Sequence, residues 1–278
     1  MTADWSRITI TADVDRVDAI AAALVEATGQ GVEEPRAGVI CTIVESAGAA
    51  TSLATELHRR FGGIDIIVEA TVPVDWSTRW RDGIVTRSFG RLVLTPSWLP
   101  VPPRENLVVV SIDPESAFGS GEHGSTRGAL ALLERRLAAG DRVLDLGSGS
   151  GILAIAAVKL GARSAIGIEV DADALPIADE NARKNRTAHA VTFLVGDAAQ
   201  LAPLAGPAEL ICSNILRSVN TSLMPAILAA LAPRGTIIFA GMEENEAPLF
   251  LGVLAAHELE VVEETRDAGW WSVAVQPR

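Results

Sequence analysis

Several features are scarce or missing in this chain of 278 residues, and their scarcity narrows what it can be. It has no tyrosine and only two cysteines, Cys41 and Cys212. The two cysteines are far apart in apolar segments, so we expect two buried, reduced thiols and neither a disulfide nor a zinc site. The longest apolar runs, such as Ile152–Val158, are far shorter than a membrane span.

Positive charge is also in short supply, with 23 basic against 35 acidic side chains and a net charge of −12. A phosphate backbone or an anionic membrane attracts clustered Lys and Arg, so we expect no direct nucleic-acid binding and no membrane partner. The four histidines lack metal-ligand spacing, and we expect no metal. No basic segment followed by an apolar run opens the chain, so we expect a cytoplasmic protein without a signal peptide.

What is present predicts two α/β regions joined by a connector. Residues 1–72 alternate strand and helix patterns in the order βαββαβ, which is typical of a small ferredoxin-like α+β domain. Residues 73–105 hold Pro and Trp residues that we expect to bury a joint between domains, or to line a groove. Residues 106–278 alternate strands with helices, which predicts a doubly wound, Rossmann-like, mostly parallel sheet.

The strongest local motif is the Gly-rich turn that includes Gly147, Gly149 and Gly151 and follows the predicted strand Arg142–Leu146. Such a turn lets the backbone approach a ligand and presents N–H groups at a helix N-terminus. The Gly-rich motif of nicotinamide enzymes needs a glycine at its sixth position, and this chain has Ile152 there. Asp145 is awkward beside a pyrophosphate but suits a ligand that carries an ammonium or sulfonium group.

Two further carboxylates follow predicted strands. Glu169 ends the strand after the Gly-rich turn, where a carboxylate accepts hydrogen bonds from ribose hydroxyls. The alternative, an acid that caps the next helix, suits Asp171 or Asp173 better. Asp197 ends the following strand and either binds an adenine amino group or forms a turn.

Together these motifs resemble class I methyltransferases that use S-adenosylmethionine. The loop of residues 118–126 (FGSGEHGST) and the strand end Ser213-Asn214-Ile215-Leu216 narrow the resemblance to the bacterial ribosomal protein L11 methyltransferase family. The segment Asp75–Trp80 and the pair Trp270-Trp271 also match that family. The resemblance implies an N-terminal domain that recognises the substrate.

By matching position, the resemblance also implies that Thr126, Gly147, Glu169 and Asn214 contact S-adenosylmethionine. We add Gly149 and Asp197 to this predicted cofactor site on the reasoning above. The implied reaction is methylation of lysine ε-amino or N-terminal α-amino groups, and the implied partner is a basic, lysine-bearing ribosomal protein. We expect the enzyme to be a monomer.

The chain departs from the family pattern in the loop and after the strand end. The replacements in this sequence are Ser120, Glu122, Gly124, Ser125, Arg217 and, for the usual Asp, Glu169. They leave the cofactor chemistry intact and put the acceptor in question. The alternatives are therefore a related methyltransferase with another protein or small-molecule acceptor, or a binding module without turnover; a nicotinamide dehydrogenase is the weakest alternative.

Methyl transfer to an amine needs a free lone pair and alignment. We hypothesise that the side-chain oxygen of Asn214 orients the amine, the alternative being that Asn214 only holds the cofactor or the strand end. His123 is a candidate general base, although a histidine in a Gly-rich loop is more often structural.

Overall fold

The computed structural model describes residues 5–71, 84–102, 104–113, 119 and 121–278. The chain divides into two compact units, Met1–Gly83 and Ile84–Arg278, and each is described by itself. In the described part, no helix is both long and apolar enough to cross a bilayer. The predicted segment Asp75–Trp80 lies outside the described residues, as do Phe118 and Ser120 of the loop.

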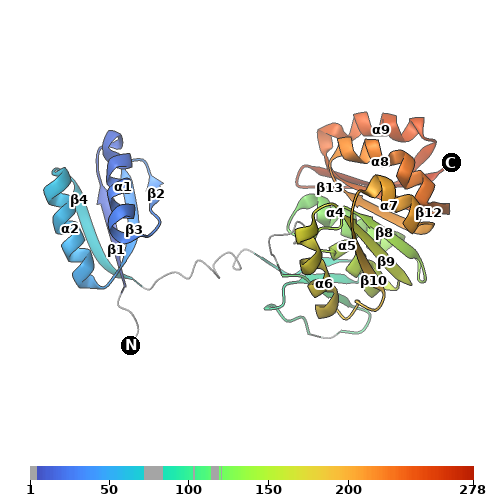
Figure 1. Cartoon of the computed structure of the whole chain (residues 1–278), viewed down its shortest axis with the longest axis horizontal. Coiled ribbons are helices and arrows are strands. Elements are labelled where there is room, and N and C mark those ends of the chain that lie inside the picture. Colours follow the sequence, from blue (N-terminus) through green and yellow to red (C-terminus); the bar gives the residue numbers. More distant parts are fainter. Residues whose placement is uncertain (1–4, 72–83, 103, 114–118, 120) are drawn as a thin grey trace. The chain divides into compact units, whose positions relative to one another are not determined.

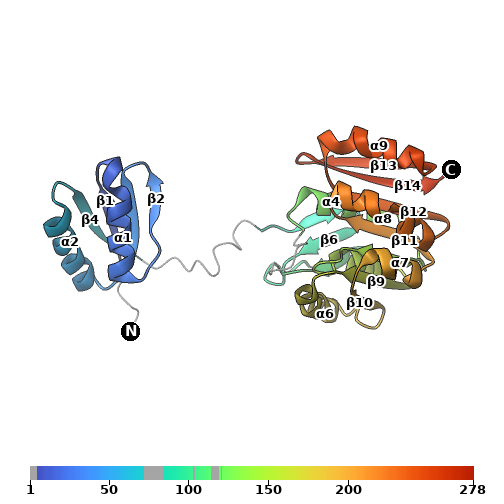
Figure 2. The same ribbon diagram turned by 45° about the horizontal axis from the view of Figure 1, so that its top comes forward.

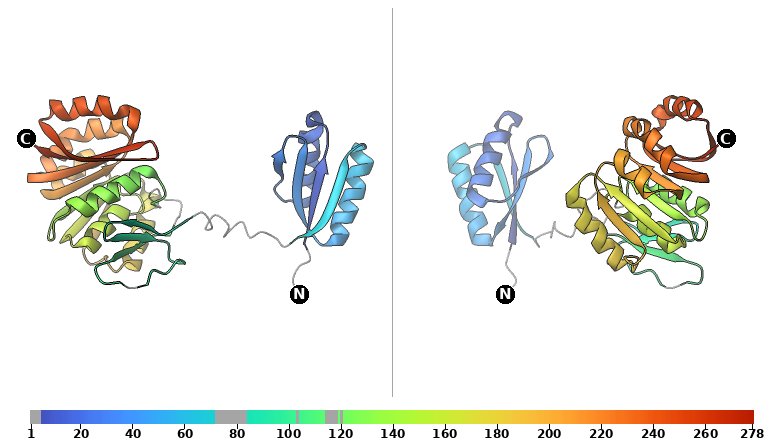
Figure 3. Two further views of the ribbon diagram at one scale, coloured as in Figure 1. Left: turned by 180° about the vertical axis from the view of Figure 1, so that it is seen from behind. Right: turned by 45° about the vertical axis from the view of Figure 1, so that its right-hand side comes forward.

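The first unit is a four-stranded antiparallel sheet with two helices on one face (Figure 3). Its elements are β1 (Trp5–Thr11), α1 (Val17–Thr28), β2 (Glu33–Arg36), β3 (Val39–Glu45), α2 (Ala47–Phe61) and β4 (Asp65–Thr71). The strand order β2-β3-β1-β4 is that of a ferredoxin-like domain, which confirms the predicted fold. The core forms because alternate residues of β1, such as Ile8 and Ile10, face apolar side chains of both helices.

The second unit is built on a seven-stranded sheet in the order β10-β9-β8-β11-β12-β14-β13 (Figure 2). The strands are β8 (Arg142–Leu146), β9 (Ser164–Glu169), β10 (Val191–Val195), β11 (Ala208–Asn214), β12 (Leu231–Glu243), β13 (Leu259–Asp267) and β14 (Trp270–Pro277). All neighbours pair in parallel except β14, which runs antiparallel to both β12 and β13. The predicted doubly wound sheet is therefore confirmed.

Helices cover both faces of this sheet (Figure 1). One core packs beneath α4 (Gly124–Arg136), α5 (Ile152–Leu160) and α6 (Leu175–Lys184). The other packs beneath α7 (Ala198–Ala205), α8 (Arg217–Ala230) and α9 (Ala247–Ala256). Adjacent residues of β8 face opposite cores, Val143 the first and Leu144 the second, as the two-residue period of a strand requires.

A separate small sheet lies at the start of the second unit. It consists of β5 (Arg87–Phe89), β6 (Leu92–Thr95) and β7 (Val108–Ser111), in that order. Two of its strands fall inside residues 73–105, which the sequence analysis assigned to a connector. They form because the fully buried β6 pairs with β7, and both contribute apolar side chains to the core beneath α5.

The strand order reverses between β8 and β11, since the chain first moves outward through β9 and β10 and then returns to the other side of β8. In open α/β sheets, ligands bind in the crevice outside the carboxyl ends of the strands at such a reversal. Gly147 follows β8, and Asn214 ends β11, so both predicted site residues lie at this point.

Candidate functional site

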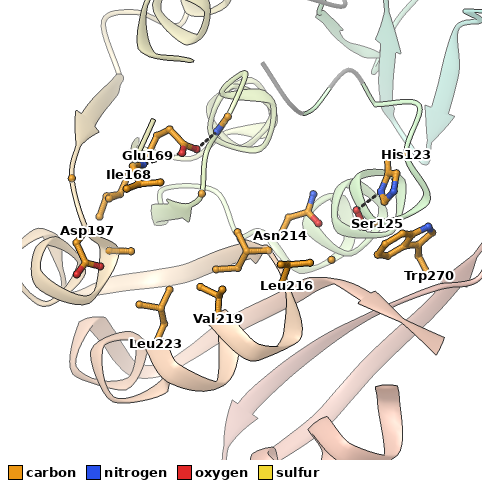
Figure 4. Close-up of a pocket in the computed structure, with 17 residues that line it drawn as sticks. His123, Ser125, Ile168, Glu169, Asp197, Asn214, Leu216, Val219, Leu223 and Trp270 are labelled. Atoms are coloured by element: carbon orange, nitrogen blue, oxygen red, sulfur yellow. Dashed lines mark hydrogen bonds between the residues drawn. The ribbon is translucent and has the colours of Figure 1, made fainter. Parts of the chain in front are cut away.

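A cavity of about 630 Å³ lies at this switch point. Its walls come from the carboxyl ends of β8, β9, β10, β11 and β12, from the start of α4, from α8 and from the start of β14. Five of the six predicted cofactor residues line it: Gly147, Gly149, Glu169, Asp197 and Asn214. Figure 4 shows Glu169 and Asp197 at one end, His123, Ser125 and Trp270 at the other, and Asn214 between them.

The Gly-rich turn contributes Gly147 and Gly149 to the cavity lining, and it has little room for side chains. Gly147 has a φ of +70°, and a Cβ there would lie 2.5 Å from Cγ2 of Ile215. Gly151 has a φ of +78°, and a Cβ there would lie 2.5 Å from the ring of Phe193. Glycine is therefore required at both positions for close packing of strand, turn and helix.

Glu169 is bound to backbone N–H groups around the turn. Its Oε2 accepts from the N–H of Gly149 at 2.9 Å, and its Oε1 accepts from Val170 at 2.9 Å and Asp171 at 3.1 Å. An ionised carboxylate has about four acceptor positions, so it can still accept from hydroxyl groups in the cavity. These bonds hold Glu169 against the turn, at the place where the sequence analysis puts the ribose.

The acids near the next helices act as caps. Asp171 accepts from the N–H of Asp173 at 2.9 Å, as predicted for a capping acid. Asp197 is the N-cap of α7, and its Oδ1 accepts from Ala199 at 2.8 Å. Asp197 also lines the cavity, and its Oδ2 takes no part in the bond to Ala199.

Asn214 has one satisfied and one unsatisfied amide atom. Its Nδ2 donates to Oγ1 of Thr126 at 3.2 Å, whereas its Oδ1 is buried and has no hydrogen-bond partner among the described residues. Thr126 has no exposed surface and lies behind Asn214, while its neighbour Ser125 lines the cavity. The structure thus gives Thr126 a supporting position, and its predicted contact with the cofactor stays a prediction.

The far end of the cavity is formed by an aromatic pair. The ring centroids of His123 and Trp270 are 4.2 Å apart, and Nδ1 of His123 lies 2.7 Å from Oγ of Ser125. Burial, and then the nearby Arg127 guanidinium, lower the pKa of His123 below its usual value. The lowered pKa favours the neutral imidazole, which lies in the wall of the cavity.

Asp145 is not among the residues that line the cavity, and the interpretation of this acid from sequence stays a prediction. It is 1% exposed and lies beneath the Gly-rich turn. Its Oδ2 accepts from the N–H of Ala154 at 3.0 Å, in the first turn of α5, because the N-cap Gly151 has no side chain to do so. Burial, and to a lesser degree the Glu169 charge, raise the pKa of Asp145 to about 7.

Ion pairs and close packing hold the segment before α4 and the first turn of α4 in place. Arg87 of β5 contacts Glu122 at 2.5 Å, and Arg127 binds both carboxylate oxygens of Asp267 at 2.6 and 2.8 Å. Gly124 is packed so closely against the β13–β14 turn that a Cβ there would lie 2.4 Å from the Asp267 carbonyl oxygen. The departures Glu122 and Gly124 thus belong to a wall that joins α4 to this turn.

Gly241 lines the cavity and was not singled out from the sequence. Gly241 in β12 has a φ of +81°, and a Cβ there would lie 2.4 Å from the Ile215 carbonyl oxygen. Ile215 lies between Gly241 and Gly147, in contact distance of both. The only sequence signal was a glycine near the end of a predicted strand, which marks a close backbone approach.

The comparisons with known proteins agree with this geometry. Residues 36–278 match the family model described as ribosomal protein L11 methyltransferase (PrmA). The chain belongs to the ribosomal protein L11 methyltransferase family. The resemblance found from the sequence is thereby confirmed.

Individual members of the family align over most of this chain. The ribosomal protein L11 methyltransferase of Geobacter metallireducens is 31% identical over 96% of both chains. That of Synechococcus sp. is 39% identical over 73% of this chain and 68% of its own. A crystal structure of the ribosomal protein L11 methylase from Lactobacillus delbrueckii subsp. bulgaricus superposes with a TM-score of 0.62 at 28% identity, covering 69% of this chain and 99% of that one. The second unit therefore has the class I methyltransferase fold of the family.

Proposed function

We propose that this protein transfers methyl groups from S-adenosylmethionine to amino groups of ribosomal protein L11. The family supplies the reaction class and the acceptor protein. The observation that carries the proposal at atomic level is Oδ1 of Asn214, which has no hydrogen-bond partner in the part of the chain that the structure describes and lies between the two ends of the cavity (Figure 4). An unsatisfied acceptor in such a place is suited to a ligand that brings N–H donors.

The cavity suits S-adenosylmethionine. Glu169 and Asp197 would bind the ribose hydroxyls and the adenine amino group at one end. Gly147 and Gly149 would let the rest of the cofactor lie against the backbone, and Asn214 would border its reactive end. When bound, the cofactor supplies a methyl group on a sulfonium centre, which an amine lone pair can displace in line.

The residues of the chain then have to desolvate and orient the amine. Deprotonating a lysine with a pKa near 10.4 costs about 4–5 kcal/mol at pH 7. The apolar side chains of Leu216, Val219 and Trp270 around the cavity reduce that cost by disfavouring the charged ammonium. Oδ1 of Asn214 would accept one amine N–H and so direct the lone pair toward the methyl group.

We propose that the first unit recognises the acceptor protein, as the resemblance implies. The net charge of −12 favours association with a basic ribosomal protein, and this attraction is weakened by salt. The proposal predicts that the KM for the acceptor rises with ionic strength while the affinity for the cofactor changes little. A KM independent of salt would refute the role assigned to charge.

The proposed function is tested by incubating the full-length protein with methyl-labelled S-adenosylmethionine and purified ribosomal protein L11, followed by mass spectrometry. Label on lysine or N-terminal amines is expected. We also expect Asn214→Ala to lower kcat by at least about tenfold, because alignment of the amine is lost. An unchanged rate in that variant would refute the role of Asn214, and no label on L11 would refute the acceptor.

A second candidate acceptor class is favoured by Arg217. This residue begins α8, and its Nε donates to Oε1 of Glu246 at 2.9 Å. Glu246 lines a side chamber of about 390 Å³ that shares Leu216, Gly241 and Trp270 with the main cavity. A guanidinium beside this chamber changes the surface that an acceptor meets, so label on another protein of a ribosome-containing lysate would favour this second candidate.

A further inference from the structure

Asn220, a residue of α8 that does not line the cavity, makes a buried hydrogen-bond network directly behind the Asn214 turn. It has no exposed surface. Its Oδ1 accepts from Oγ of Ser213 at 2.6 Å, and its Nδ2 donates to the carbonyl oxygens of Ile215 at 3.0 Å and Ala240 at 3.2 Å. One amide thus joins β11, the turn that follows it and β12.

The chemistry of these partners determines the orientation of the amide. Two carbonyl oxygens can only accept, so the nitrogen must face them, and the oxygen must face the Ser213 hydroxyl. Every strong hydrogen-bonding atom of the Asn220 amide is then used. Asp at this position would bring a carboxylate to both carbonyls, and an apolar residue would remove all three hydrogen bonds.

The turn that this network holds is also restricted by close packing against two glycines. The Ile215 side chain lies over Gly147, and its backbone lies against Gly241, each at a distance that excludes a Cβ on the glycine. The Asn220 amide holds the Ile215 carbonyl from the third side. Asn214 and Leu216, which flank Ile215, both line the cavity. A shift of the Ile215 peptide would therefore move Asn214 and the wall next to it.

We propose that Asn220 is a positioning residue for methyl transfer, which holds the Asn214–Leu216 turn so that Oδ1 of Asn214 faces the acceptor amine. The predicted effect on the rate of methyl transfer rests on the proposed function. The predicted effect on the position of the Asn214 side chain rests on the structure alone. A positional error near 1 Å in a reacting group can cost on the order of 100-fold in rate.

A matched control lies elsewhere in the same unit. Asn185, which is 5% exposed, accepts from the N–H of Ser111 at 2.8 Å and donates to the carbonyls of Ser111 at 2.7 Å and Asn181 at 2.9 Å. It thus makes the same number of side-chain hydrogen bonds as Asn220, between β7 and α6, and it does not line the cavity. Asn185→Leu reproduces the loss of a buried amide without touching the Asn214 turn.

The test compares Asn220→Leu with Asn185→Leu in the full-length enzyme, at a temperature where both are folded by circular dichroism. We expect Asn220→Leu to lower kcat about 10- to 100-fold, with an affinity for S-adenosylhomocysteine within about threefold of wild type. We expect Asn185→Leu to keep kcat within about twofold. Equal kcat values for the two variants would overturn the proposal.

A double variant shows whether Asn220 acts through Asn214. Adding Asn220→Leu to Asn214→Ala should slow the enzyme no further, because the group being positioned is already absent. If the double variant instead shows the product of the two single-variant losses in kcat, the proposal is overturned. If Asn220→Leu does not fold, Ser213→Ala can be used instead, because it removes one hydrogen bond of the network. We expect this variant to lower kcat several-fold. An unchanged kcat would again contradict the proposal.

A readout without turnover separates this inference from the proposed function. The side-chain amide resonances of Asn214 in nitrogen-15 NMR should move in Asn220→Leu and stay in place in Asn185→Leu. If wild-type enzyme labels no L11 yet these resonances move as expected, the acceptor is wrong and the positioning stands. If L11 is labelled and the resonances do not move, the positioning is wrong and the proposed function stands.

Discussion

The buried Asp145 makes the stability of the second unit depend on pH in a predictable direction. Its pKa rises from 3.8 to about 7 on folding, chiefly through burial. Between these two pH values the native state holds a proton that the unfolded chain has released. The free energy of unfolding therefore falls as pH rises through this window and becomes level above about pH 7.

The size of this effect follows from the shift. Each tenfold change in proton affinity is worth about 1.4 kcal/mol, so the full window corresponds to about 4 kcal/mol, and the part between pH 5 and pH 7 to about 3 kcal/mol. Cys212, the neighbour of Asp145 in β11, stays protonated throughout because burial and Asp145 raise the pKa of its thiol well above the usual value. The carboxyl is thus the group that Asp145→Asn removes, while the Asn oxygen can keep the bond from Ala154.

Native-state hydrogen exchange measures the effect within the second unit. The amides of Leu144 and Ile211, in paired core strands, exchange only on large-scale opening. Comparing Asp145→Asn with wild type at each pH cancels the chemical exchange rate. We expect the protection of the variant relative to wild type to grow about 100-fold between pH 5 and pH 8. A ratio that stays constant over this range would refute the reasoning.

Three further predictions concern the cavity and its wall. Gly147→Ala should weaken S-adenosylhomocysteine binding at least about tenfold in calorimetry, because its methyl group would meet Ile215 at 2.5 Å on a backbone with a φ of +70°; unchanged affinity would contradict this. Arg127→Met should lower stability by about 1–3 kcal/mol in thermal unfolding, since Asp267 loses two hydrogen bonds; a smaller loss than in a surface Arg→Met control would count against it. His123→Asn should leave the shape of the pH–rate profile between pH 6 and pH 8 unchanged, because His123 packs against Trp270 and is paired with Ser125 in the cavity wall; loss of the acid limb would make His123 a general base.

Most elements of both units were predictable because their patterns are local. The predicted strand Arg142–Leu146 coincides with β8. The small sheet of β5, β6 and β7 was not predictable in this way. β6 is four residues long and buried throughout, so it shows no alternation, and its partner β7 pairs with it instead of joining the large sheet.

The sequence by itself determined the two folds, the Gly-rich turn and the positions of Glu169, Asp197 and Asn214 at strand ends. These follow from residue periodicity and from the rule that ligands bind at the carboxyl ends of parallel strands. Only the tertiary structure decided which side chains face the cavity. Thr126 lies behind Asn214, 88 positions away in sequence, and Asp145 turns inward to α5. Sheet register and helix packing set such contacts between distant residues, and no local pattern encodes them.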